Sequence, residues 1–451
     1  MPIVTPSQSP KSRVPVVDVL FVSDDRIPLG SVLLSFADIA KRGRIRDDDS
    51  IDQLNHWATV GLLTAMAMGT GAKQFVGMPI RCWLPAQYKK KMYQHYANQY
   101  CWISHMYYVP FSEPIAFDEE DRWEVDISFY RWVTVMFLIQ ALLFKLPYIL
   151  WRELKGYSGL NVAKVVGMTL ETSVMTQDKR DEQLSHAAAF MHRWLQTYTM
   201  YKYNAISRFR EKISGIFFCF GKRTGTYLTG LYMFTKILYV ANIVGQFFML
   251  SAFLGLNYWN LGIDAMRELN KYGRWQDHYT FPRIGLCDYK IRQMANVQTF
   301  SVQCVLSINL FLEKMYLIMW FWMVGLLAAN IVSLGIWFYG EVMPGRAERF
   351  MSRYIRLLDI DNAHDKTIFK LFVLNYLRSD GVFIIRMVVK NAGGMLSTDL
   401  VKQMWLVFQK GLQKRDGPNG APRSLPRQPS APAEDIDGDD QGESPEKDFT
   451  N

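Results

Sequence analysis

Four long apolar stretches, separated by charged and aromatic-rich segments, dominate the pattern along this chain of 451 residues. Each is close to the length of about 20 largely apolar residues that a helix needs to cross a bilayer. They lie at 55–76, 129–151, 227–254 and 315–340. The pattern therefore predicts an all-α membrane protein, built as a bundle of four transmembrane helices with large loops between them.

The first stretch is the least apolar, because Thr59, Thr64 and Thr70 are spread among its glycines. Small and hydroxylated side chains on a transmembrane helix either allow close packing or face water. This helix is therefore the best candidate to line a pore, with these three threonines as pore-lining candidates. Close packing against a neighbouring helix is the alternative interpretation.

A proline and a lysine interrupt the later stretches. Pro147 lies near the far end of the second one, where it removes a backbone donor and favours a kink. We treat Pro147 as a candidate gating hinge, with a purely structural kink as the alternative. Lys236, in the third stretch, has three possible roles: facing a pore, meeting an internal partner, or snorkelling to the headgroups. Its place near the predicted cytoplasmic end favours snorkelling.

Charge on the flanks predicts the orientation. A basic cluster at 41–46 precedes the first stretch, and the loop 152–226 is basic just before the third. Because positively charged loops stay on the cytoplasmic side, the loops 77–128 and 255–314 are predicted to be extracellular and both termini cytoplasmic. We expect no secretory signal, since the first long apolar stretch begins only after residue 50.

The remaining segments differ in texture. The amino-terminal segment 1–54 is polar and proline-rich, apart from an apolar patch at 30–40 that we interpret as a possible pore helix. The loop 152–226 and the segment 341–410 mix apolar and charged residues at helical spacing, which predicts a helical cytoplasmic loop and a carboxyl-terminal helical domain. Prolines, glycines and acidic residues then predict a disordered tail at 411–451.

Four of the five cysteines lie in the two predicted extracellular loops: Cys82, Cys101, Cys287 and Cys304. Their spacing contains no CxxC pair, so we do not expect a metal site. An extracellular position favours disulfides. Four cysteines allow three pairings, so the connectivity stays open on this ground alone.

Composition excludes several function classes. The net charge of +9 is explained by cations on the cytoplasmic flanks, without a basic domain that would bind nucleic acid. The seven histidines form no HExxH motif, and the chain has no GxSxG motif or glycine-rich phosphate loop. We therefore expect neither an enzyme nor a bound cofactor.

Three segments resemble one known family. They are PIRCWLPAQY and NQYCWI in the first loop, the run from Phe281 to Trp322 in the second, and SDGVFIIRMVVKNAGG from Ser379. Together they are similar to the innexins, the invertebrate gap-junction subunits, and their texture is most like that of nematode members. The similarity covers roughly 30–408.

The resemblance implies a function and an assembly. A subunit of this kind contributes to a channel in the plasma membrane that joins two cytoplasms and passes ions and small metabolites. The resemblance also implies a ring of eight innexin subunits per hemichannel, identical or mixed, surrounded by membrane lipids and docked on the hemichannel of the adjacent cell. It further implies bridges Cys82–Cys304 and Cys101–Cys287, with pairing inside each loop as the alternative.

One departure from the family leaves two other functions open. If the patch at 30–40 is the pore helix, the chain carries an amino-terminal extension that is longer than the family's short pore helix. An extension that blocks the pore would make the chain a non-conducting auxiliary or adhesion subunit. The other alternative is an undocked hemichannel that releases small molecules to the outside.

Overall fold

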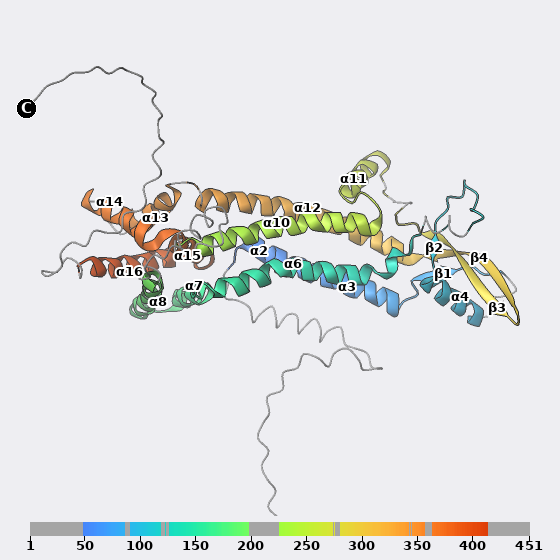
Figure 1. Cartoon of the computed structure of the whole chain (residues 1–451), viewed down its shortest axis with the longest axis horizontal. Helices are drawn as coiled ribbons and strands as arrows, with labels where there is room; N and C mark the ends of the chain where they lie inside the picture. Colours follow the sequence, from blue (N-terminus) through green and yellow to red (C-terminus); the bar gives the residue numbers. More distant parts are fainter. Residues whose placement is uncertain are drawn as a thin grey trace, which may run out of the picture.

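The computed structural model describes residues 48–85, 91–118, 122, 126–197, 225–273, 275, 280–341, 343, 345–356 and 363–413. Long helices run side by side along the molecule, with a β-sheet at one end and a group of shorter helices at the other (Figure 1). We call these the sheet end and the helical-domain end. The possible pore helix at 30–40 and nearly all of the predicted tail lie outside the described residues.

Three of the four predicted spans are confirmed as helices long and apolar enough to cross a membrane. They are α6 (Val133–Gly156), α10 (Tyr227–Leu254) and α12 (Ser307–Glu341). Their outward faces carry exposed Leu142, Phe248 and Ile336, as expected of helices surrounded by lipid. Helix α6 continues past the predicted limit through a polar end, 152–156, and α12 begins eight residues before the predicted limit, at Ser307.

The remaining predicted span, the first one in the chain at 55–76, contains a shorter regular α-helix than predicted. Helix α3 (Val60–Phe75) has 16 residues and follows a π-helical segment, η1 (Leu54–Thr59), and a short α2 (Ser50–Gln53). The Thr59 hydroxyl donates to the carbonyl of Leu54, five residues earlier, which matches the wider π turn. That first span therefore stays a prediction, although the backbone is helical from Ser50 to Phe75.

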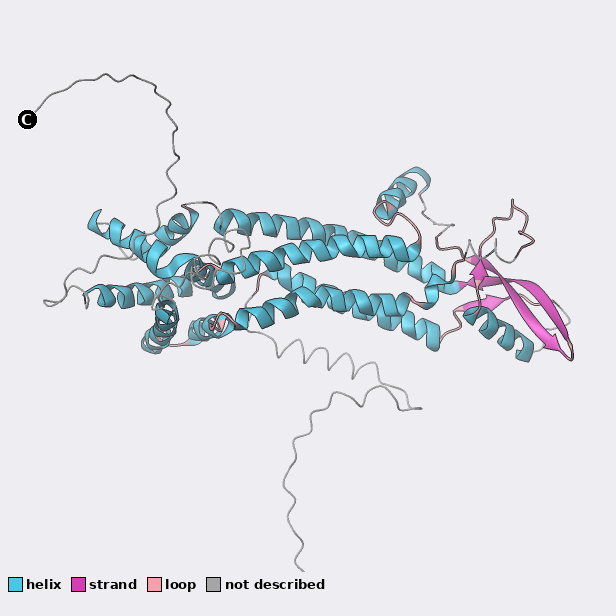
Figure 2. Ribbon diagram, viewed as in Figure 1, coloured by secondary structure: helices cyan, strands magenta, loops and turns pink. Residues whose placement is uncertain are grey.

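The sheet end is where the all-α prediction is wrong. An antiparallel sheet has the strand order β1-β4-β3-β2 and joins the two loops (Figure 2). Its strands are β1 (Ile80–Cys82), β2 (Met106–Tyr107), β3 (Ile284–Gln293) and β4 (Asn296–Leu306). In β4, Val302, Cys304 and Leu306 alternate with exposed residues, which is the period of a half-buried strand.

Two helices complete the loops. Helix α4 (Lys91–Ile103) lies beside the sheet, and α11 (Leu261–Tyr272) projects from the side of the bundle after α10 (Figure 1). Gly262 in α11 lies directly against the indole of Trp320, where a Cβ atom would collide with the ring. Glycine at this position therefore lets α11 pack close to α12.

The helical domain consists of α7, α8 and the helices after α12. The bounds are α7 (Val162–Glu171), η4 (Thr172–Val174), α8 (Gln177–Thr197), α13 (Arg346–Arg356), α14 (Ala363–Lys370), η5 (Leu371–Leu377), α15 (Arg378–Ala392) and α16 (Gly394–Gln413). Helix α15 is the central element, because its consecutive residues Val382, Phe383, Ile384 and Ile385 are all buried. A helix that is apolar on every side needs neighbours around it.

Candidate functional site

Two disulfides hold the loops together at the sheet end. Cys82 on β1 is bonded to Cys304, the residue directly opposite it on β4. Cys101 on α4 is bonded to Cys287 on β3. These are the two pairs that the family resemblance implies, and each joins one loop to the other. All four residues are buried, and the bridges are adjacent, with the sulfurs of Cys82, Cys101 and Cys304 within 4.8 Å of one another.

A charged contact, which the sequence did not reveal, adds a third link. The Arg122 guanidinium donates to Asp288 Oδ2 on β3 at 2.7 Å and to two backbone carbonyls of its own loop. The Tyr107 hydroxyl donates to Asp288 Oδ1 at 3.1 Å. Burial, together with the Asp288 carboxylate, raises the pKa of Tyr107 to about 12, so this hydroxyl stays a donor at physiological pH.

The candidate pore threonines occupy different environments. Thr59 and Thr70 are 0 % exposed. Thr59 accepts a hydrogen bond from the Trp322 indole at 3.0 Å, and the hydroxyl of Thr70 lies 3.0 Å from that of Thr134 on α6. For both residues this arrangement favours the alternative interpretation, close packing between helices. Among the three, only Thr64 keeps accessible surface in the single subunit.

The helical segment from Ser50 to Phe75, which we call the first helix, has one exposed face. Its members are spaced three or four residues apart: Trp57, Gly61, Ala65, Met68 and Ala72. Residues at this spacing share one side of a helix. The other predicted site on a span, Pro147, is buried inside α6, and the helix continues past it to Gly156. Its role as a gating hinge stays a prediction.

A buried ionic cluster lies where the bundle meets the helical domain. Lys236 on α10 is 1 % exposed, and its Nζ lies 2.7 Å from Asp52 Oδ1 and 3.4 Å from Asp49 Oδ2. It also donates to the Ser333 hydroxyl at 2.7 Å. The expectation that Lys236 snorkels is therefore wrong, because the carboxylates of Asp49 and Asp52, at the start of the helix Ser50–Phe75, satisfy its charge inside the subunit.

The same cluster extends into the helical domain. The Trp337 indole and the Lys390 ammonium both donate to Asp49 Oδ2 at 3.0 Å. Burial alone would raise the pKa of Asp49, but Lys236, Trp337 and Lys390 together lower it to about 2. The Tyr232 hydroxyl on α10 donates to Asp52 Oδ2 at 2.5 Å. We call the seven residues the Asp49–Lys236 cluster: Asp49, Asp52, Tyr232, Lys236, Ser333, Trp337 and Lys390. It joins the segment before the first span to α10, α12 and α15.

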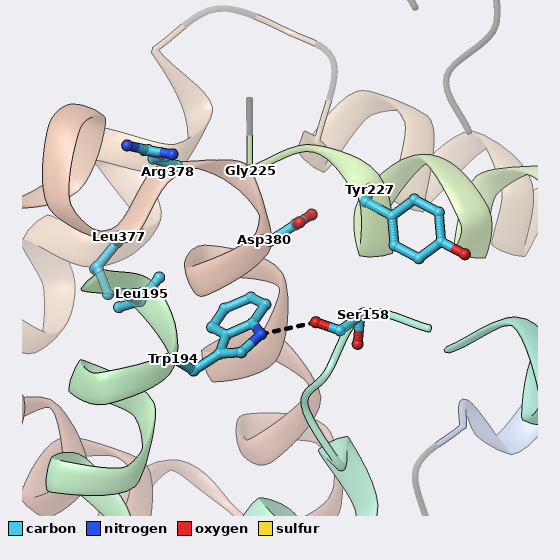
Figure 3. A pocket seen from close by; sticks show the side chains of 8 residues that line it. All are labelled: Ser158, Trp194, Leu195, Gly225, Tyr227, Leu377, Arg378 and Asp380. Carbon is cyan, nitrogen blue, oxygen red and sulfur yellow. Dashed lines mark hydrogen bonds between the residues drawn. The ribbon is translucent and has the colours of Figure 1, made fainter. Parts of the chain in front are cut away.

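A second carboxylate ties the helical domain to α10. Asp380, near the start of α15, accepts hydrogen bonds from the backbone amide and the hydroxyl of Thr229 at 3.0 and 3.1 Å. Figure 3 shows its carboxylate beside Gly225 and Tyr227, at the edge of a small cavity. Burial raises the pKa of Asp380, and the backbone amides at the start of α10 oppose that shift. Asp380 therefore caps α10 from a helix 151 residues away.

Replacing Asp380 by alanine is expected to lower the free energy of unfolding by about 1–2 kcal/mol, because the first amides of α10 lose their acceptor. Asp380→Asn keeps one oxygen acceptor and should lose less. Thermal unfolding of the purified protein in detergent measures both, with Asp178→Ala on the exposed first turn of α8 as the control. An alanine variant as stable as the wild type would contradict the capping role.

The described residues define a class of protein. It is a membrane protein with three apolar helices long enough to span a bilayer, a disulfide-linked sheet at one end and a helical domain at the other. The chain matches the innexin family over residues 48–408 and belongs to that family. The resemblance seen in the three sequence segments is confirmed. Innexins form oligomeric gap-junction channels and are not enzymes.

Individual relatives agree with this assignment. The chain is 36% identical to innexin unc-9 of Caenorhabditis elegans over 359 residues, which are 80% of this chain and 92% of that protein. It is 32% identical to innexin-10 of the same nematode over 86% of this chain and 69% of that protein. Innexin-11 is 32% identical over 80% of this chain and 79% of that protein.

Proposed function

We propose that the chain is a subunit of docked gap-junction channels that pass ions and small metabolites between adjacent cells. In this proposal eight subunits form each hemichannel in the plasma membrane, alone or with other innexins. The sheet end is extracellular, and the helical domain and both termini are cytoplasmic. The observation that carries the proposal is the braced sheet end.

The braced sheet end suits docking for a physical reason. Two disulfides and the Arg122–Asp288 contact fix the loops before a partner arrives, so less ordering entropy opposes association. The β3–β4 hairpin extends beyond the short strands β1 and β2, and Met294 at its turn is fully exposed. In the described part of the chain, no further strand pairs with the distal half of this hairpin. In this proposal the distal half of the hairpin is the part of the sheet that faces an opposing subunit.

Recording from paired cells tests the docked channel directly. Two cells that both express the chain should show junctional conductance, and single cells should take up little dye. Dye uptake by single cells without junctional conductance would instead support an undocked hemichannel. If neither junctional conductance nor dye uptake is seen although the protein is at the cell surface, the non-conducting alternative is supported. Recording after deletion of residues 1–29 then shows whether the extension blocks the pore.

The exposed face of the first helix is the proposed pore lining, and Thr64 lies at its margin. A cysteine at Ala65 is expected to react with a charged, membrane-impermeant thiol reagent and to reduce the current by more than half. Leu63→Cys is the matched control, because Leu63 is 0 % exposed inside the subunit. Thr70→Cys should behave like that control. Block at position 63 with none at 65 would place the pore on a different face.

A further inference from the structure

Helix α13 carries an arginine face directly after the last span. Its four arginines are Arg346, Arg349, Arg353 and Arg356. At 3.6 residues per turn they fall within an arc of about 80° around the helix axis. The one acidic residue of the helix, Glu348, lies about 80° outside the nearest edge of that arc. This side of α13 is therefore uniformly positive.

The arginine face points away from the protein. Met351, Tyr354 and Ile355 occupy the opposite side of α13 and are buried in the core of the helical domain. Arg349, Arg353 and Arg356 are exposed. Among the residues that the structure describes, none of these three guanidinium groups forms an ion pair with a carboxylate. The packing of the apolar side thus fixes the direction in which the positive charge faces.

Helix α13 begins at Arg346, and only four residues separate it from the last span, α12, which ends at Glu341. Exposed Ile336 and Phe338 on α12 belong to the lipid-facing side of the last span. One residue further, the Arg346 guanidinium stacks on the exposed ring of Tyr339 with 3.9 Å between the guanidinium carbon and the ring centroid. Gly345, at φ +75°, makes the turn that joins α12 to α13. The first arginine of the face therefore lies against the exposed side of α12.

We propose that the arginine face of α13 binds the anionic headgroups of phospholipids in the leaflet next to the helical domain. Clustered guanidinium groups just outside a span pair with phosphate oxygens and attract anionic lipids. The site needs only that α12 crosses the membrane, so it is independent of docking between cells. It assigns α13 a ligand class, phosphorylated inositol lipids and phosphatidylserine.

The test uses the full chain, purified in neutral detergent micelles. Binding of a fluorescent phosphatidylinositol bisphosphate is titrated for the wild type and for Arg349→Gln/Arg353→Gln/Arg356→Gln. Each arginine is expected to contribute about fivefold, so the triple variant should bind about a hundredfold more weakly. The matched control removes three exposed lysines of the same domain, Lys179→Gln/Lys402→Gln/Lys410→Gln, and should bind within about threefold of the wild type.

Three outcomes would overturn the proposal. The triple arginine variant binds the lipid as tightly as the wild type, the lysine control loses as much affinity, or inorganic phosphate at equal concentration competes as well as the lipid does. The last result would assign the face to free anions instead of lipid. Thermal unfolding of both triple variants in lipid-free micelles should be unchanged, which shows that weaker binding does not result from misfolding. The single variant Arg353→Gln gives a second, milder test of binding.

Discussion

Replacement of Lys236 by methionine is expected to lower the free energy of unfolding by about 3–5 kcal/mol. The ammonium group lies 2.7 Å from Asp52 in a fully buried site, so its removal leaves that carboxylate without a cation. Asp49 is less affected, because Lys390 still contacts it at 3.0 Å. Because methionine is nearly as long as lysine, the decrease in the free energy of unfolding results from the lost charge and not from a cavity.

The measurement is the thermal unfolding of the purified assembly, followed together with the yield of oligomer. Lys410→Met, at an exposed position of α16, is the control and should leave both unchanged. Adding Asp52→Asn to Lys236→Met should recover part of the lost stability, because the orphaned charge is removed as well. A single variant that is as stable as the wild type, or a double variant that is no better than the single one, would refute the role of the cluster.

Replacing Cys101 and Cys287 by serine is expected to cost about 4 kcal/mol, whereas replacing all four loop cysteines should cost about 9 kcal/mol in the chain-entropy model. The bridges close stretches of 222 and 186 residues, one inside the other. While Cys82–Cys304 remains, the Cys101–Cys287 bridge closes only the small loop between the two bridges. That loop contains 222 minus 186, or 36, residues, and only these gain freedom when the inner bridge is lost. Loss of both bridges also opens the 222-residue loop that Cys82–Cys304 closes, so the second loss is the larger one.

Junctional conductance should follow the same order, weakened without one bridge and absent without both. Thermal unfolding and paired-cell recording measure the two effects, with surface labelling to show that the protein reaches the membrane. Cys219→Ser, at the fifth cysteine, is the control; Cys219 lies outside the described residues. Equal losses for one bridge and for two would contradict the nested arrangement. Conductance without either bridge would show that bracing is not needed for docking.

Hydropathy alone was enough to find three spans, because membrane helices are determined by local composition. The sheet was missed for the opposite reason. Strands β1 and β4 pair across more than 200 residues, so their stability comes from contacts that a local window does not contain. The alternation at Val302, Cys304 and Leu306 was a usable signal. The disulfide pairing came from the family resemblance, since spacing left all three pairings open.

The Asp49–Lys236 cluster could not be predicted from the sequence for a different reason. A lysine in an apolar span indicates an internal partner or a route to water, and only the fold distinguishes them. Asp52 is 184 positions before Lys236, and Lys390 is 154 positions after it. No periodicity links residues so far apart. Polar residues that pack between helices, such as Thr59 and Thr70, also look like water-facing residues when the neighbours are unknown.

The helix from Ser50 to Phe75 is held at both ends. At one end the Asp49–Lys236 cluster ties it to α10, α12 and α15, and at the other Cys82 fixes the strand that follows it to β4. A helix that is fixed at both ends cannot slide along its axis, so a force on one end makes it twist or bend. The π turn at Leu54–Thr59 departs from α-helical hydrogen bonding, so we expect the helix to twist or bend at this turn. Movement of the helical domain would therefore reach the first span as torsion.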